Sequence, residues 1–399
     1  MSYIFKIQLT QLTPLLHFQY GWPGATLRAT EFKPKFDRFL IANEFCSPNE
    51  GKKTLDYKVT ITVDDQLKEN NLYPPNKFLF FGNMGSDGQE KQDTKELVKH
   101  KQIKLTFMSF NSKLIETIKE KICIFFALHN FGTRQSKGYG GFYPVKSNDY
   151  NYISFQNALE QCVKLKVSKD DERCNKCIAV FELTGGKGGW EKRVVDFHKL
   201  LKAGINNSRL QETSNNESDN RDMNEDSKDT KYYQKSLLCR YMIAKGIRWE
   251  KRKIKKTYPE LVKRDAVRVV YRDRPNDRTM FVRALLGLTS QYKYGKKSVN
   301  VDDTAPEQDR IVRFRSPITY KVNGNSIYII CFNSYESLFG KRFKFSLEES
   351  SGEPFLLSVP NEKEFDLLDF MREAGKMLET LDLSLTALHS AKLILIKDS

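Results

Sequence analysis

The stretch FGTRQSKGYGGFY, from Phe131 to Tyr143, combines four glycines, two cations and four aromatic rings. Glycine permits positive φ angles and a close approach of the backbone to a ligand, and successive N–H groups in such a loop form a concavity suited to an anion. Arg134 and Lys137 add positive charge, and the interleaved rings offer flat faces to unstacked bases. The pattern predicts a loop that binds a phosphate backbone with splayed bases, and a glycine turn between two elements is the structural alternative.

The residues before this loop predict the order strand, helix, strand, strand, helix, and a further strand is expected after it. Apolar residues alternate in the predicted strands, and they recur at helical spacing in the predicted helices. Asn111 or Ser112 is placed to cap the second helix. This order is the split βαβ arrangement of a ferredoxin-like domain. The strands are expected at 2–16, 55–63 and 103–107 and the helices at 27–40 and 112–126, with 65–100 as an insertion.

A second domain is expected from residue 146 to the C-terminus, because one core rarely grows beyond about 250–300 residues. The whole chain is predicted to be α+β, with two ferredoxin-like βαββαβ domains at 1–145 and 146–399, antiparallel sheets and insertions. The stretch 206–230 has three basic and seven acidic residues and almost nothing apolar, so we expect a disordered excursion there. The remaining predicted elements are strands at 178–183, 310–322 and 325–332, the last two joined at Asn323-Gly324, and helices at 190–203 and 361–380.

The charge of the chain favours a polyanionic partner. Lys and Arg number 66 against 50 Asp and Glu, which gives a net charge of +16, and nucleic acid comes before membrane as the partner of such a protein. The block Arg240–Arg274 alone holds 13 basic and four acidic residues, interrupted by Trp and Tyr. It is interpreted as a second RNA track, a docking surface or a solvated helix.

The chain is expected in the cytoplasm. The sequence opens directly in a strand pattern without a leader, and its seven cysteines are an odd, scattered set, which is typical of reduced thiols in the cytosol. No apolar run approaches the roughly 18 residues that a membrane span needs.

Several segments together resemble the RAMP superfamily, the RNA-binding subunits of CRISPR effector and processing complexes. FGTRQSKGYGGF after a helix is similar to the glycine-rich loop of that superfamily, and LTPLLHFQ with GATLRATEFKPKFDRFL is similar to its first strand, loop and helix. RTMFVRALLGL and the Arg-x-Ser-Pro strand FRSPITYKV resemble segments of the second half. In length and order the chain most resembles the first subunit of the Cmr (type III-B) complex.

The resemblance implies an RNA-binding, non-catalytic subunit of a type III CRISPR ribonucleoprotein in antiviral defence. Its partners would be the other RAMP subunits, the CRISPR RNA (in its 3′ region) and the target RNA, and no cofactor is expected. The alternative is a metal-independent endoribonuclease of the same superfamily acting on CRISPR RNA. Such enzymes carry their glycine-rich loop near the C-terminus, whereas here the loop lies one third of the way along the chain.

Ten residues are predicted to contact RNA, through phosphate charge and through base stacking. Arg28 opens a helix, where N–H groups favour anions. The lysines among the ten have an ordinary solvated helix face as their alternative reading. The set is Arg134, Lys137, Tyr139 and Phe142 in the loop, and His17, Gln19, Arg28, Lys33, Lys35 and Arg38 in the first loop and helix.

Two further patterns are alternatives with a chemical role. His17 and His129 are both expected at the loop end of the first domain, where a histidine pair could supply a general base and acid for RNA cleavage; His129 bonded to a backbone carbonyl is the structural alternative. A zinc site would need a Cys-x-x-Cys pair completed by two more ligands, and paired thiols without metal are the other reading. Its candidate ligands are Cys162, Cys174, Cys177 and His198.

The glycines of Gly185–Gly189 lack the Gly-Lys-Ser/Thr ending of a nucleotide-binding loop. They predict a turn.

Overall fold

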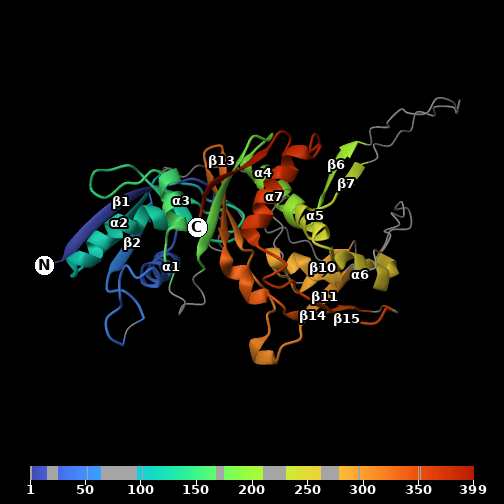
Figure 1. Ribbon diagram of the computed structural model, residues 1–399. Helices are drawn as coiled ribbons and strands as arrows, with labels where there is room; N and C mark the ends of the chain where they lie inside the picture. Colours follow the sequence, from blue (N-terminus) through green and yellow to red (C-terminus); the bar gives the residue numbers. More distant parts are fainter. Residues whose placement is uncertain are drawn as a thin grey trace. The chain divides into compact units, whose positions relative to one another are not determined.

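The computed structural model forms two compact units (Figure 1). The first contains 1–181, 319–330 and 396–399, and the second contains 182–318 and 331–395. The residues described are 2–15, 26–51, 53–63, 97–100, 102–167, 175–209, 231–261, 278–294, 297–348, 350 and 352–399.

The first sheet is built from the N-terminal elements in the predicted order. Its strands stand in the order β2-β3-β1-β4, and every pair is antiparallel. Asn111 caps the second helix by accepting a hydrogen bond from the N–H of Leu114 at 3.2 Å, as expected. The elements are β1 (Tyr3–Gln11), α1 (Ala29–Ala42), β2 (Lys58–Val63), β3 (Ile103–Ser109), α2 (Ser112–Leu128) and β4 (Phe142–Pro144).

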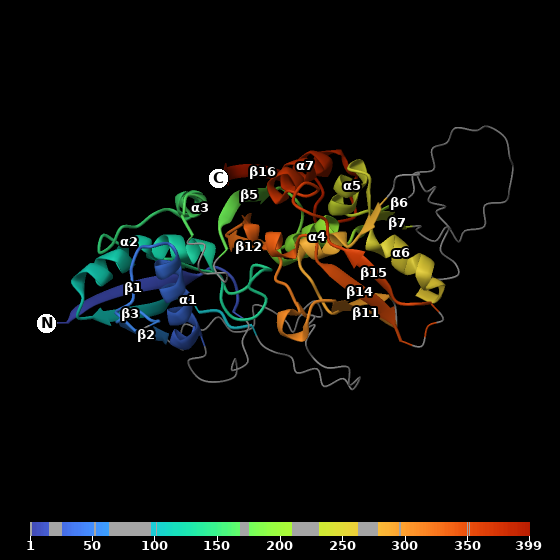
Figure 2. The same ribbon diagram turned by 60° about the horizontal axis from the view of Figure 1, so that its bottom comes forward.

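The helices α1 and α2 cover one face of this sheet (Figures 1 and 2). Alternate residues of β1 and β3 point toward them and are buried, which is what period-two patterning dictates. Phe107 of β3 packs against Phe32 and Phe36 of α1 at ring-centroid distances of 5.9 and 6.3 Å. Phe125 of α2 lies 4.6 Å from Phe36, so a continuous aromatic core fixes both helices.

The residues after 145 belong to the first unit as well. The helix α3 (Phe155–Val163) packs on α2, where Cys162 contacts the carbonyl of Ile124 at 3.7 Å. The hydroxyl of Tyr143 donates to the carbonyl of Ile153 at 2.6 Å. The expected boundary at 145 therefore lies inside this unit, because the apolar face of α3 is buried in the same core.

A second sheet repeats the sequential scheme of the first. Its order is β12-β13-β5-β16, and counted along the chain this is the second, third, first and fourth strand, as in the first sheet. The predicted hairpin turn is confirmed, with Gly324 at φ +59°. The elements are β5 (Cys177–Thr184), α4 (Trp190–Lys202), β12 (Ile318–Asn323), β13 (Ser326–Phe332), α7 (Leu367–Thr380) and β16 (Lys392–Asp398).

Two elements are shorter than predicted. The strand expected from 310 begins at Ile318, because a 3-10 turn at Glu307–Asp309 and an irregular stretch precede it. The helix expected from 361 begins at Leu367, where Asp366 accepts the N–H of Asp369 at 2.7 Å and caps it.

A third sheet belongs to the second unit. Its strands β10 and β11 come from a long insertion between β5 and β12 in the sequence, and β14 and β15 follow β13. Its order is β10-β11-β14-β15, all antiparallel. Phe281 packs on Phe343 and Phe345 at 5.4 and 4.9 Å and supplies its core. The strands are β10 (Gln291–Tyr294), β11 (Lys297–Asp303), β14 (Arg342–Leu347) and β15 (Phe355–Ser358).

The same insertion contains several short elements, some of them in the basic block Arg240–Arg274. The expected excursion begins later than residue 206, because Ile205–Arg209 forms β6 and pairs with β7 (Lys231–Gln234); residues 210–230 lie outside the described part. The other elements of the insertion are α5 (Leu237–Ala244), β8 (Ile247–Trp249), α6 (Glu250–Thr257), β9 (Arg278–Met280) and the 3-10 turns Pro259–Leu261 and Val282–Leu286. A further 3-10 turn, Asn333–Leu338, follows β13.

Within the described ranges, none of the helices combines the length and the apolar character required to cross a membrane.

Candidate nucleic-acid interface

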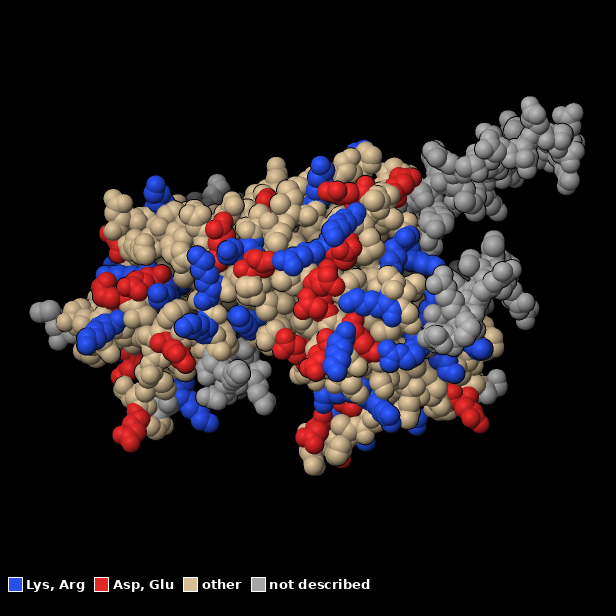
Figure 3. Space-filling model, viewed as in Figure 1, with Lys and Arg blue, Asp and Glu red and all other residues tan. Residues whose placement is uncertain are grey.

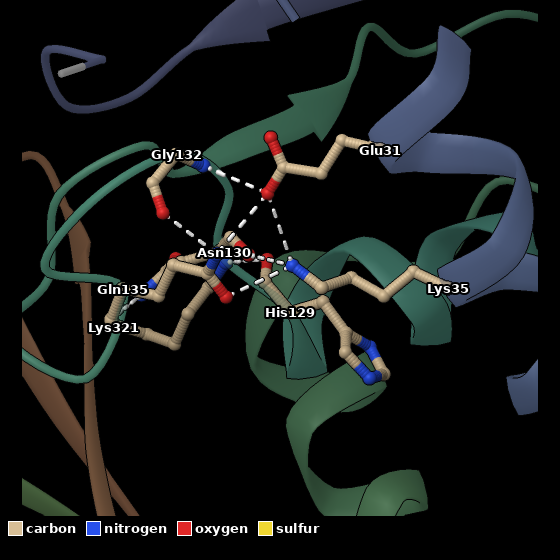
Figure 4. Close-up of polar contacts among 7 residues, drawn as sticks. All are labelled: Glu31, Lys35, His129, Asn130, Gly132, Gln135 and Lys321. Carbon is tan, nitrogen blue, oxygen red and sulfur yellow. Dashed lines mark hydrogen bonds and ion pairs between the residues drawn. The ribbon is translucent and has the colours of Figure 1, made fainter. Parts of the chain in front are cut away.

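The glycine-rich loop is fastened to α1 by a polar cluster (Figure 4). One carboxylate oxygen of Glu31 accepts from the N–H of Gly132 at 2.9 Å and from the side chain of Gln135 at 3.1 Å. Lys35 donates to Gln135 at 2.9 Å and to the carbonyl of Asn130 at 3.0 Å, and it pairs with Glu31 at 3.3 Å. One helical turn thus spaces an acid and a base so that both reach the loop.

The strand β12 contacts the loop where the N–H of Tyr320 donates to the carbonyl of Ser136 at 3.3 Å, and its Lys321 binds the end of α2 just before the loop (Figure 4). This side chain is 0% exposed, and its ammonium donates to the carbonyls of Phe126 and His129, both at 2.8 Å. Burial lowers the pKa of Lys321 to about 7, and a neutral amine still offers two N–H donors for the two carbonyls. Asn130 adds bonds to the carbonyls of Gln135 at 2.7 Å and Tyr320 at 2.9 Å.

Several backbone N–H groups of the loop donate to acceptors within the protein. These groups are therefore not available to an anion, contrary to the prediction from the sequence. The N–H of Gly140 donates to the carbonyl of Pro14, and that of Gly141 donates to the hydroxyl of Thr13, both at 2.8 Å. A Cβ at Gly140, whose φ is +69°, would lie 1.9 Å from the carbonyl oxygen of Phe131. Glycine is needed here for the close packing of one backbone on another.

The aromatic rings of the loop are part of the core. Phe131 and Phe142 are 0% exposed and pack edge to face at 5.9 Å, and Tyr139 is only 6% exposed. A ring must present a face to solvent to stack on a base. The structure therefore does not support the prediction that Tyr139 and Phe142 stack on RNA, because both rings are buried in the apolar interior.

Three of the predicted cations remain beside the loop. Arg28 is exposed at the start of α1, and it lines a pocket of 390 Å³ together with Glu31, Gly132 and Thr133. Arg134 is half-buried at φ +56°; partial burial lowers the pKa of its guanidinium, and Tyr139 opposes that shift. Lys137 is half-buried, with its ammonium 5.9 Å from the ring centre of Tyr320. These side chains supply the positive charge of the site.

The other five predicted RNA contacts are two lysines bonded within the protein, one half-buried arginine and two residues that the structure does not describe. Lys33 pairs with the buried Asp37 at 2.7 Å and donates to the carbonyl of Leu55 at 2.9 Å. Its charge therefore balances a buried carboxylate of α1. Lys35 belongs to the cluster that fastens the loop. Arg38 is half-buried on α1. His17 and Gln19 lie outside the described residues.

His129 has a structural environment. It follows α2, and its Nδ1 lies 3.1 Å from the carbonyl of Phe125. Its ring stacks on that of Phe125 at a centroid distance of 4.7 Å and meets Phe39 edge to face. These contacts match the structural alternative for His129, whereas His17, the other half of the proposed pair, is not described.

The zinc alternative is not tested, because Cys174 lies outside the described residues. The thiol of Cys162 contacts the carbonyl of Ala158 at 3.2 Å, and burial raises the pKa of Cys177 to about 12. His198 lies on α4. Within the described ranges, no three His, Cys, Asp or Glu side chains gather closely enough to hold a metal ion.

The prediction of a turn at Gly185–Gly189 is confirmed. Gly185, Gly186 and Gly188 have positive φ angles, and α4 begins directly after Gly189.

Two family models match nearly the whole chain. The Cmr1 N-terminal domain matches residues 2–205, and the Cmr1 C-terminal domain matches residues 233–386. The chain belongs to the Cmr1 family. This confirms the resemblance to RAMP subunits of the type III-B complex, and family membership implies a subunit of a Cmr effector complex.

Among solved structures, the chain is similar to the crystal structure of Cmr1 from Pyrococcus furiosus (apo form). The sequences are 11% identical, the match covers 83% of this chain and 88% of that one, and the TM-score is 0.34. No curated protein matches this sequence. Family membership of this Cmr1 chain therefore depends on the family models.

Proposed function

We propose that this Cmr1 chain is a non-catalytic, RNA-binding subunit of a cytoplasmic type III-B ribonucleoprotein in antiviral defence. It would contact the 3′ region of the guide RNA, the target RNA or both. The observation that carries the proposal is that Arg134 and Lys137 lie in a loop that Glu31 and Lys35 bond to α1, with Arg28 beside it. A rigid support reduces the conformational entropy that the cations lose when they bind phosphate.

We also propose that the two sheets with the same strand order are ferredoxin-like domains. The first follows β1-α1-β2-β3-α2-β4, and the second follows β5-α4-β12-β13-α7-β16 with a long insertion after α4. Sheets of this kind are common supports for single-stranded RNA. The insertion explains why the second pattern is hard to detect in the sequence.

Binding should depend on charge at phosphates more than on stacked rings. The predicted rings of the loop are buried, so the sequence preference contributed by this site is expected to be weak. Phosphate contacts fix position and carry little sequence information. Base reading would then come from the pairing of guide and target, or from other subunits.

The test is the retention of labelled single-stranded RNA by purified protein without metal. The double variant Arg134→Ala/Lys137→Ala should raise the dissociation constant by about tenfold or more, because two charge-assisted contacts are lost. A matched control is Lys58→Ala/Lys113→Ala, which removes the same charge from exposed positions of the first unit. Equal affinity of wild type and double variant would contradict the proposed site.

The same incubation decides between a binder and a nuclease. Intact RNA after incubation supports the binder. A cut product that disappears in His129→Ala would replace the proposal by an endoribonuclease.

A further inference from the structure

A second basic site lies in the insertion of the second unit, where Lys and Arg side chains gather beside α6 (Figure 3). The end of β8, the first turns of α6 and one side of α5 surround a pocket of 120 Å³. Its polar lining consists largely of cations around one indole ring. These residues are Lys235, Arg248, Trp249, Lys251, Arg252 and Lys255.

The one acidic residue of α6 is turned away from this pocket. Glu250 is 0% exposed, and its carboxylate accepts the N–H of Val282 at 3.0 Å and pairs with the side chain of Arg283. This carboxylate acts on Lys251 from outside the pocket, which it does not line. Among the described residues that line the pocket there is no Asp or Glu.

One cation of the pocket, Lys251, is largely buried beside the others. Burial lowers the pKa of Lys251 to about 8, and the nearby charges of Arg283 and Lys255 lower it further, against the opposing effect of Glu250. Like charges gathered in a desolvated place destabilise one another. An anion in the pocket would relieve that repulsion, so the geometry and the electrostatics favour the same class of ligand.

The size of the pocket limits that ligand. Pockets that enclose a whole small molecule typically measure about 300–1,000 Å³, whereas this one measures 120 Å³. A single phosphate group, with the rest of its molecule outside, is a better fit than a whole nucleotide. Arg and Lys are the residues that hold phosphate in proteins.

We propose that this pocket binds one backbone phosphate of an RNA strand, as a phosphate contact separate from the glycine-rich loop. The choice of RNA over free phosphate rests on the proposed function, whereas the anion site itself does not. Lys255 is exposed and Arg252 is half-buried, so both can be changed without opening the core.

The experiment compares Arg252→Ala/Lys255→Ala with wild type in two titrations. In the first, fluorescence anisotropy of labelled single-stranded RNA is followed at several salt concentrations. The dissociation constant should rise about tenfold, and the slope of its logarithm against log salt should fall by about 0.7, the value for one phosphate on a single strand. In the second, inorganic pyrophosphate is added and tryptophan fluorescence is recorded, with Trp249→Phe expected to remove the response.

Two controls address folding and general charge. Arg252→Lys/Lys255→Arg keeps the charges and should bind as wild type does. Lys363→Ala/Lys376→Ala removes two exposed charges elsewhere in the second unit and should leave both titrations nearly unchanged.

Each outcome decides the proposal. A response to pyrophosphate, together with unchanged RNA affinity in the pocket variant, means a site for free phosphate and overturns the RNA assignment. If wild type binds no RNA but pyrophosphate alters Trp249 fluorescence, the proposed function fails and the anion site stands. No effect in either titration overturns the site altogether.

Discussion

The two basic regions of this Cmr1 chain use their cations in different ways. Around the glycine-rich loop, Lys33 and Lys35 are bonded to carboxylates and carbonyls of their own domain. Around the α6 pocket, several cations line one cavity that no described Asp or Glu lines, and Glu250 is paired with Arg283. In the sequence, both regions have more Lys and Arg than Asp and Glu. The structure adds where the carboxylates lie: Asp37 and Glu31 pair with the lysines of α1, whereas no described Asp or Glu lines the α6 pocket.

The sharpest way to break this comparison is to disrupt the support of the loop. Gly140→Ala would place a Cβ 1.9 Å from the carbonyl oxygen of Phe131, so we expect a loss of about 4 kcal/mol or more in the free energy of unfolding. The measurement is chemical denaturation followed by circular dichroism. Gly51→Ala is the matched control, because it has a similar φ of +72° with nothing within 4 Å, and it should cost only about 1 kcal/mol.

If Gly140→Ala and Gly51→Ala destabilise the protein equally, the close backbone contact has no energetic weight. The loop would then be an adaptable turn and not a rigid support.

A somewhat smaller effect is expected for the structural role of Lys33. Lys33→Met leaves the carboxylate of Asp37, which is 3% exposed, without its ion pair, and should destabilise the protein by about 3 kcal/mol. Lys33→Met/Asp37→Asn should recover most of that loss. RNA affinity, measured where each variant is folded, should stay unchanged; a salt-dependent loss of affinity would return Lys33 to the RNA-binding set.

The buried Lys321 should make stability depend on pH. Its folded pKa is about 7, below the ordinary lysine value of 10.5, so between these values the unfolded state binds more protons and stability rises with pH. Burial is the main cause; Lys35 lowers the pKa further and Cys162 raises it.

Lys321→Met removes this titration and also the two bonds to backbone carbonyls. We therefore expect it to destabilise by about 2 kcal/mol at pH 9 and by less at pH 6, where the wild type has the penalty of a buried charge. Other lysines titrate in both proteins, so the difference between wild type and variant isolates Lys321. A constant difference from pH 6 to pH 9 would contradict this account.

Much of the first domain could be predicted from the sequence, because its strands alternate and Asn111 marks the start of α2. The roles of the loop's rings could not, since Phe131 and Phe142 resemble exposed stacking residues until their burial is known. Glu31 and Asn130 gave no local signal, because their partners are about 100 and 190 residues away. Lys321 could have been noticed as a lone charge within the apolar strand ITYKV, where all five residues are buried.

The most direct measurement of the central claim is the salt dependence of RNA binding. If Arg134 and Lys137 each contact one phosphate, their joint replacement by Ala should reduce the slope of log affinity against log salt by about 1.4. The control Lys58→Ala/Lys113→Ala should keep the wild-type slope. An unchanged slope in the Arg134→Ala/Lys137→Ala protein would show that no RNA strand passes along the glycine-rich loop.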